Sequence, residues 1–231
     1  MRILLTALML GMLAASPTSA AERRFTITSF ERVRIDGPFA VTLATGTAPS
    51  ARARGSANAL DRVVIEVQGS TLVVRRDRNG WGGNPGDSDS PVEIMLSTHD
   101  LTSAWVNGSG SLAIDKVRGL KFDLSVAGAG LAEIGSANVD QLHIGLIGSG
   151  VGKVGGKALR LTASLEGASA LQAGEMTVKD ATINVSGPGN VQLTATDTAK
   201  IDARGPSMIA LRGRPACTNR LEGSAVVSGC K

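Results

Sequence analysis

The sequence predicts an all-β protein that folds as a right-handed parallel β-helix, or solenoid, with about 18–20 residues in each coil. Three observations predict this fold: a glycine-led unit that recurs along the second half, apolar residues that alternate with polar ones before each unit, and an unusual composition. Of the 231 residues, 42% are hydrophobic but only 3% are aromatic, and 29 are glycine. Such a chain can form a core, but its small side chains favour thin, repeated layers.

The recurring unit begins with a glycine and continues with further small residues. Successive leading glycines are 20, 20, 19, 20, 18 and 18 residues apart. A fixed period near twenty is typical of a solenoid, because each coil is too thin to bury a core alone and must stack on its neighbours. A phosphate-binding loop is the alternative, but it should lead into a helix, whereas a strand is predicted after every unit. The leading glycines are Gly108, Gly128, Gly148, Gly167, Gly187, Gly205 and Gly223.

Apolar residues precede each glycine with a period of two, so they share one face of a strand and point into the coil. The residues two before the glycines are Val106, Val126, Leu146, Leu165, Val185, Ala203 and Leu221, and those four before are Ala104, Leu124, Ile144, Ala163, Ile183, Ile201 and Asn219. A second short strand follows each corner, as at Leu112 and Ile114, so each coil should hold at least two short strands. Parallel crossovers are nearly always right-handed, which gives the expected hand.

Residues 22–231 are predicted to form a single domain, with less regular coils over 22–101 and regular coils with a C-terminal cap over 102–231. The segment 35–43 has the same frame as 185–193, so the fold should begin with the same coil. The segment 63–74 predicts a hairpin with a tight turn that contains glycine. The segment 58–62 is long enough for one helical turn but too short to predict a helix.

The two ends of the chain predict an exported protein. Residues 1–20 join an early arginine, a short apolar run and small residues at the end, which is typical of a cleaved signal peptide. A retained membrane anchor is the alternative, although the run is shorter than the roughly 20 residues that span a bilayer. Cys217 and Cys230 should pair in an oxidising compartment and pin the last coil, the alternative being two buried free thiols. His99 and His143 are too distant in sequence to complete a metal site with them, and no metal is predicted.

Residues 78–91 predict a loop, because they are rich in glycine, proline and serine and lack aliphatic side chains. Trp81 in this loop is a candidate contact residue, the alternative being an insertion whose tryptophan covers a coil edge. Arg75, Arg76 and Arg78 belong to a basic cluster of the first half that could meet anionic lipid A or acidic polysaccharide, or could simply form a solvated face. Asp87 and Asp89 lack the further ligands of a calcium loop.

With the leader, the 35–43 opening, the 63–74 hairpin and the glycine repeats from 108 onward, the chain resembles the exported bacterial family named after the autotransporter adhesin head GIN domain. The resemblance covers roughly residues 27–212. It implies a β-helix-like fold and a role in adhesion or envelope interaction. It brings no catalytic residues.

A non-catalytic binding protein, periplasmic or extracellular, is therefore the favoured function, with an envelope or cell-surface ligand that is a glycan or a protein. A polysaccharide-active enzyme would need clustered carboxylates or a placed base. The outward residues do not supply them: one line holds Asp123, His143, Thr162, Thr182 and Lys200, and another holds Glu133, Lys153, Gln172 and Gln192. A self-assembling structural protein is a third hypothesis, and a homo-oligomer is compatible with the first. No cofactor is predicted, and a modest net charge of +4 argues against nucleic acid.

Overall fold

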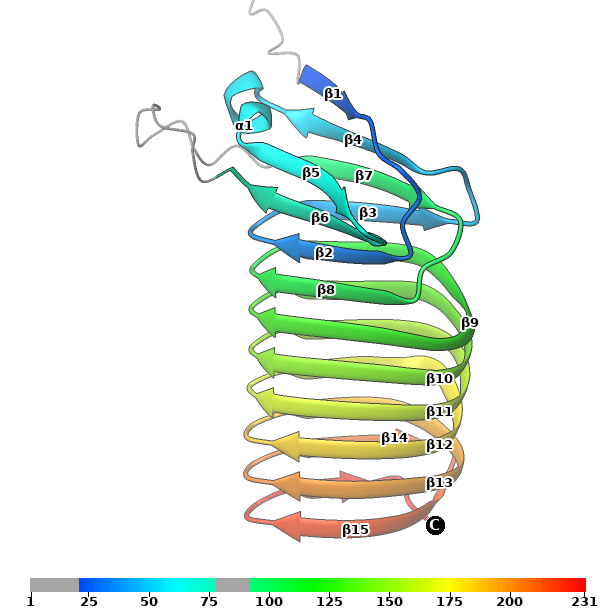
Figure 1. The fold of residues 1–231 in the computed structure, drawn as a ribbon. Helices are drawn as coiled ribbons and strands as arrows, with labels where there is room; N and C mark the ends of the chain where they lie inside the picture. Colours follow the sequence, from blue (N-terminus) through cyan, green and yellow to red (C-terminus); the bar gives the residue numbers. More distant parts are fainter. Residues whose placement is uncertain (1–20, 78–91) are drawn as a thin grey trace, which may run out of the picture.

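The computed structural model describes residues 21–77 and 92–231, and there it confirms the predicted solenoid, which has about six turns. All sixteen strands of the described residues belong to one continuous sheet that coils around a narrow core (Figure 1). In Figure 1 the strands of the front face run from right to left, the chain turns at a glycine corner, and it returns from left to right along the back face. It descends with each turn, so the coil is right-handed. The predicted signal peptide and the loop at 78–91, with Trp81 and Arg78, lie outside the described residues.

Long bent strands build the regular coils. Each strand starts after one glycine corner, runs along the back face, bends, and ends at the next corner on the front face. The two short strands expected in each coil are therefore two arms of a single strand. The gentle bend leaves most of the backbone pairing with the next coil intact, so the chain has no need of a loop there. These strands are β9 (Ser111–Gly128), β10 (Leu131–Gly148), β11 (Val151–Gly167), β12 (Ala170–Ser186) and β13 (Asn190–Arg204).

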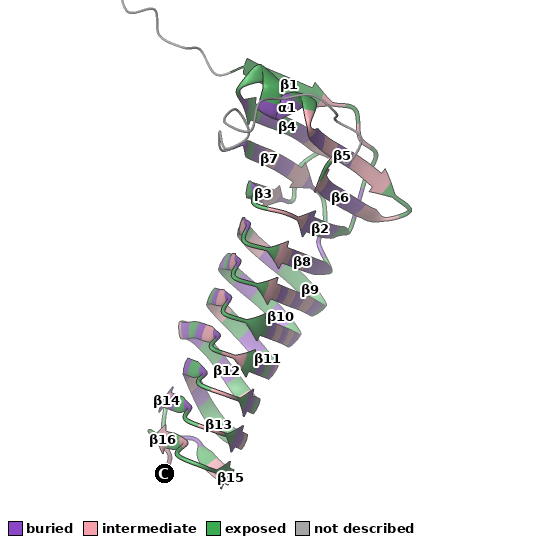
Figure 2. Ribbon diagram, turned by 90° about the vertical axis from the view of Figure 1, so that its left-hand side faces the viewer, coloured by how far each residue is buried: buried purple, intermediate pink, exposed green. Residues whose placement is uncertain are grey.

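The core consists of columns in which like side chains stack on like, as the sequence predicts. Leu124 pairs in register with Ile144, and Ile144 with Ala163, and all three are buried. Figure 2 shows the resulting alternation of buried and exposed residues along the long strands β9 to β13. Phe122, at the start of the front arm of β9, is fully buried. Parallel packing of this kind holds each coil in one register, because a slip by one residue would turn the apolar column outward.

The glycine corners are structural. Gly128 has a φ of 113°, a conformation that L side chains rarely adopt. A Cβ atom built on Gly128 would lie 2.6 Å from the carbonyl oxygen of Gly108 in the coil above. That same oxygen accepts a hydrogen bond of 2.9 Å from the backbone N–H of Ala129. The corner therefore needs glycine both for its backbone angle and for the close approach between coils.

The N-terminal region keeps the coil but changes the order of the layers. β2 and β3 form a coil with a corner at Gly37, as the 35–43 segment predicts. However, β2 pairs with β6 on one side and β8 on the other, and β3 pairs with β7 on one side and β9 on the other. The coil made of β2 and β3 therefore lies between the β6–β7 layer and the β8–β9 layer. The elements are β1 (Ala21–Phe25), β2 (Arg32–Asp36), β3 (Ala40–Thr45), β4 (Ser50–Gly55), α1 (Ala57–Asp61), β5 (Val63–Gln68), β6 (Thr71–Arg76), β7 (Glu93–Thr98) and β8 (Ser103–Gly108).

The hairpin predicted for this region is confirmed. β5 and β6 pair antiparallel around Gly69, which has a φ of 63°, and form the predicted hairpin. The single helical turn is α1, whose first turn is capped by the Ser56 hydroxyl accepting from the backbone N–H of Ala59. β1 and β4 also pair antiparallel and cover the end of the back face. This end of the solenoid is thus closed by elements that the repeat does not contain.

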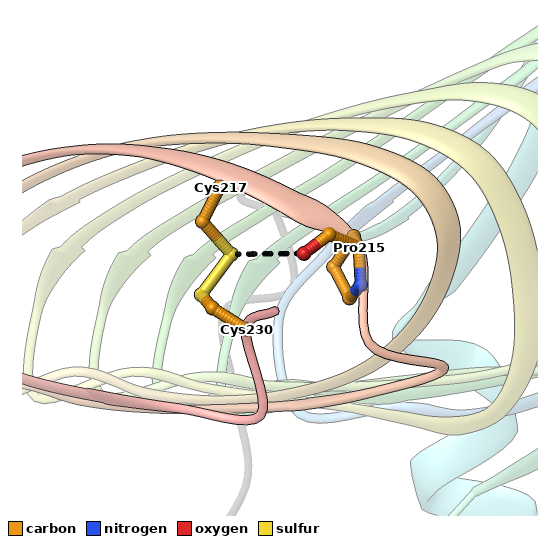
Figure 3. The surroundings of a disulfide bond; sticks show 3 residues. All are labelled: Pro215, Cys217 and Cys230. Atoms are coloured by element: carbon orange, nitrogen blue, oxygen red, sulfur yellow. Dashed lines mark hydrogen bonds between the residues drawn. A yellow bond between two sulfur atoms is a disulfide. The ribbon is translucent and has the colours of Figure 1, made fainter.

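The last coil is formed by β14 (Met208–Arg212), β15 (Ala216–Glu222) and β16 (Val226–Ser228). Cys217 and Cys230 form the predicted disulfide, with 5.7 Å between their Cα atoms (Figure 3). The sulfur of Cys217 also lies 3.7 Å from the carbonyl oxygen of Pro215, and the backbone N–H of Lys231 donates to the same oxygen at 3.1 Å. Because a disulfide sulfur carries no hydrogen, the approach of the Cys217 sulfur to Pro215 is a contact and not a hydrogen bond. The hydrogen bond from Lys231 to Pro215 holds the C-terminus against the last coil. Asn219, at an inner position, is exposed.

Candidate functional site

Some neighbouring coils differ in length, and the bend between the two arms of each strand takes up the difference. The front arms pair without interruption from coil to coil, whereas register shifts occur at the bend of β10, β11, β12 and β13. The largest lies between Ala173 and Thr177 of β12, so the three residues 174–176 have no partner in β13. The Thr194 hydroxyl donates to the carbonyl oxygen of Gly174 at 2.9 Å. β12 therefore carries a stable bulge, and Glu175 lies on it.

A groove of about 440 Å³ lies beside this bulge on the back face. The outward column that the sequence predicts runs through it, because Glu133 pairs in register with Lys153, Lys153 with Gln172, and Gln172 with Gln192. Glu175 from the bulge and Arg212 from the end of β14 complete the wall. We call this the bulge groove, and its polar side chains are Glu133, Lys153, Gln172, Glu175, Gln192 and Arg212.

The polar side chains of the bulge groove are exposed and are not paired with other protein groups of the described residues. In the part of the chain that the structure describes, none of the six makes a side-chain hydrogen bond or an ion pair within the protein. They offer two cations, two carboxylates and two amides, so the groove can both donate and accept hydrogen bonds. Glycines leave its floor open: an added Cβ at Gly174 would meet only the Arg212 guanidinium, at 3.6 Å. The arrangement suits a polar ligand with many hydroxyl or amide groups.

The predicted contact residues Arg75 and Arg76 lie elsewhere, on β6 of the front face. Arg75 donates to Glu66 at 3.2 Å, and beside it Asp36 accepts from Arg34 and from Asn107 at 2.7 Å. Burial raises the pKa of Asp36, but the bonds from Arg34 and Asn107 and the charges of Arg34 and Arg75 outweigh it, so the pKa lies below its usual value. Arg75 thus belongs to a compensated charge network, while Arg76 is exposed. Their role in binding stays a prediction.

Other members of the basic cluster are paired as well. Arg54 binds Glu22 at 2.8 Å, and this hydrogen bond lowers the pKa of Glu22; desolvation opposes it, and the charges of Arg54, Arg24 and Arg52 lower the pKa further. Arg23 binds Asp61 of α1. Arg54 and Arg75 of the predicted basic cluster, and Arg23 beside it, thus each pair with a local carboxylate.

Trp105 is an outward residue that the sequence analysis overlooked. It lies half-buried on the front face, in register between Arg34 and Ser125. The sequence signal for this was the alternation at Ala104, Trp105 and Val106. Because Ala104 and Val106 point inward, Trp105 must point to the outer face of the strand.

The front face also brings Ser103, Asp123 and His143 into one column. His143 Nδ1 lies 3.2 Å from an Asp123 carboxylate oxygen. The column places Asp123 between Ser103 and His143, so the serine and the histidine are two strand spacings apart, roughly 10 Å. A histidine must contact a serine to act as its base, so this order does not form a catalytic triad.

Within the described residues, no group of three or more His, Cys, Asp or Glu side chains could hold a metal ion. Among the same residues, no helix has the length and apolar character needed to cross a membrane.

The family model described as "Putative auto-transporter adhesin, head GIN domain" matches residues 29–215. The chain belongs to this family. Comparison with curated proteins gives no match. Among solved structures, a "putative adhesin" from Bacteroides fragilis has a TM-score of 0.79 at 18% identity, and the match covers 91% of this chain and 95% of that one. A "putative lipid binding protein" from Parabacteroides distasonis has a TM-score of 0.71 at 20% identity, covering 93% and 98%.

A "putative adhesin" from Parabacteroides merdae matches equally well, with a TM-score of 0.71 at 18% identity and coverage of 93% and 98%. At these identities the neighbours show that the fold is shared. Family and neighbours together support a non-catalytic binding role, and an exported or surface protein.

Proposed function

We propose that this head GIN domain protein is exported through a cleaved signal peptide and binds a saccharide of the bacterial envelope in the bulge groove, without turnover. The observation that carries the proposal is the set of six unpartnered polar side chains around one groove. Exposed charges elsewhere on the molecule are often paired, as at Arg54 and Arg75. Unpaired groups gathered at one hollow are the groups a ligand can satisfy.

The chemistry of the groove favours a saccharide over a protein. Protein interfaces usually centre on a buried aromatic or apolar anchor, and the outward side chains of the bulge groove include none. Gln172 and Gln192 can each donate and accept, as a pair of sugar hydroxyls requires. The column Glu133, Lys153, Gln172 and Gln192 repeats at the strand spacing of about 4.8 Å, which suits an extended chain lying along the solenoid.

The alternative of a polysaccharide-active enzyme would use Glu133 and Glu175 as its carboxylate pair. These residues belong to β10 and β12, with β11 between them. The same assay tests both functions, because an enzyme would consume the glycan that a binding protein retains.

The test is binding of the exported protein to an array of envelope glycans, followed by calorimetry on the glycan that binds. The variant Gln172→Ala with Gln192→Ala and Arg212→Ala should weaken binding roughly 100-fold, at about fivefold for each hydrogen bond lost. Gly174→Gln should also abolish binding by filling the groove, since its backbone is ordinary and only the flexible Arg212 lies near. The matched control replaces front-face polar residues, with Thr182→Ala, Asn184→Ala and Arg220→Ala.

Binding that survives both groove variants, or that falls equally in the control, would refute the groove as the site. New reducing ends or unsaturated products would support the enzyme instead. Recovery of the unprocessed chain in the cytoplasmic fraction would contradict export.

A further inference from the structure

Two leucines protrude from the bend of the solenoid. Leu120 has 78% of its surface exposed and Leu159 has 54%. Both lie opposite Asp140 of β10, because Lys121 pairs with Gln141 and Gln141 with Arg160 in the adjacent positions. The two leucines are therefore in one column, two strand spacings or roughly 10 Å apart. They point away from the core, which Phe122 and Leu161 enter from the same strands.

Cations surround these leucines. We call the residues 116–121, 136–141 and 157–160 the bend edge; they carry five cations and a single carboxylate, that of Asp140. Lys121 pairs with Asp123 at 3.1 Å. The other four have no ion pair within the described part of the chain: Lys116, Arg118, Lys157 and Arg160.

The bend edge is also hollowed. A depression of about 570 Å³ is lined by Lys116, Arg118 and Lys157 around a floor that includes Ala137 and Gly156. Arg118 pairs in register with Asn138, and Asn138 with Lys157, so no acid lies in this column. The leucine column lies directly beside it along the same strands. A row of cations beside a row of exposed leucines has the chemistry of a surface that meets anionic lipid headgroups and the acyl boundary below them.

We infer that the bend edge docks the protein onto an anionic phospholipid bilayer, with lipid phosphates in the basic hollow and Leu120 and Leu159 in the interface. Two exposed leucines add apolar burial to an electrostatic attraction, and neither contribution alone gives stable attachment. The rigid solenoid holds both rows in place, because they lie on β9 and β11, which are paired through β10. This inference is independent of the proposed function, since it uses a different surface and a different ligand.

The test is co-sedimentation of the exported full chain with vesicles of phosphatidylglycerol and phosphatidylethanolamine, compared with vesicles of phosphatidylcholine alone. Arg118→Glu with Lys157→Glu should lower the partition coefficient at least 25-fold, at about fivefold for each cation removed. Leu120→Ser with Leu159→Ser should lower it at least tenfold. One control changes equally exposed apolar residues elsewhere, Ile147→Ser with Met208→Ser, which are 51% and 58% exposed. The other makes the same change of net charge with Lys200→Glu and Lys231→Glu.

Binding to the anionic vesicles that depends on both bend-edge pairs, while both controls bind as the wild type does, supports the inference. Three results would overturn it: no sedimentation with anionic vesicles, equal sedimentation with phosphatidylcholine, or equal loss in a control and its matched variant. Full binding by the leucine variant would also overturn it, because charge adsorption alone needs no leucine. Circular dichroism of each variant separates loss of binding from loss of fold.

Discussion

Replacement of a corner glycine tests the physical basis of the stack. Gly128→Ala faces two separate penalties: the φ of 113°, and a Cβ only 2.6 Å from the Gly108 oxygen. Gly119→Ala faces only the first, because its φ is 139° and no atom lies within 4 Å of the added Cβ. Gly145→Ala faces neither, since its nearest atom is the Ser125 hydroxyl oxygen at 3.9 Å. The three variants make the same chemical change and separate backbone strain from contact between coils.

The expected magnitudes follow from these geometries. A left-handed conformation costs an L residue about 1–2 kcal/mol, offset by up to about 1 kcal/mol because alanine restricts the unfolded chain. At Gly128 the Cβ must also displace the Gly108 oxygen, which accepts from Ala129. Leaving that backbone pair unmade adds about 1–3 kcal/mol. We therefore expect a loss of about 3 kcal/mol for Gly128→Ala, the middle of a summed range of about 1–5 kcal/mol, and about 1 kcal/mol for Gly119→Ala, the middle of about 0–2 kcal/mol.

Thermal unfolding followed by circular dichroism measures these losses. A domain of this size loses about 2–4 °C for each kcal/mol, so Gly128→Ala should unfold on the order of 10 °C below the wild type. Gly145→Ala should unfold within about 2 °C of it. Equal losses for Gly128→Ala and Gly119→Ala would refute the reasoning, because the contact between coils would then contribute nothing.

Two further predictions concern the ends of the solenoid. Cys217→Ser with Cys230→Ser should cost about 3 kcal/mol locally, and hydrogen exchange should show loss of protection in β15 and β16 but not in β10; uniform loss would contradict a local cap. The folded pKa of Asp36 lies below its unfolded value, so its stabilisation is present above about pH 4 and is lost as the pH falls through the folded pKa. Asp36→Asn should therefore flatten the acid side of a plot of urea midpoint against pH, and an unchanged plot would contradict the network with Arg34 and Asn107.

The regular coils could be predicted because their signal repeats. The spacing of the glycines gives the period, and the residues two and four before each glycine give the inward face. A wrong assignment in one coil is therefore revealed by its disagreement with the other coils. The N-terminal layers carry no such redundancy. The coil at 35–43 is recognisable alone, but nothing local shows that β6 and β7 stack outside it, since that order depends on pairing between segments distant in sequence. The pairing of Arg54 and Arg75 was likewise not predictable, because their acidic partners Glu22 and Glu66 lie on other strands.

The bulge groove shows why the candidate site was harder to predict than the fold. Alignment on the corner glycines places Glu133, Lys153, Gln172 and Gln192 in one column, and the structure confirms it. The same alignment hides Glu175 and Arg212, because it fixes the phase at the corners and says nothing about the residues farthest from them.

The unequal coil lengths were nonetheless a usable signal. Gly167 and Gly187 are 20 residues apart but Gly187 and Gly205 only 18, so the coil that contains β12 holds two residues more than the coil that contains β13. Neither the corner nor the buried front arm can absorb them, because a slip there would break the apolar columns or the contacts between glycines. The bend, at residues 174–176, takes up the difference. In a solenoid whose repeat is otherwise strict, a change in coil length therefore marks where the surface departs from regularity, and the bulge groove of this chain lies at that departure.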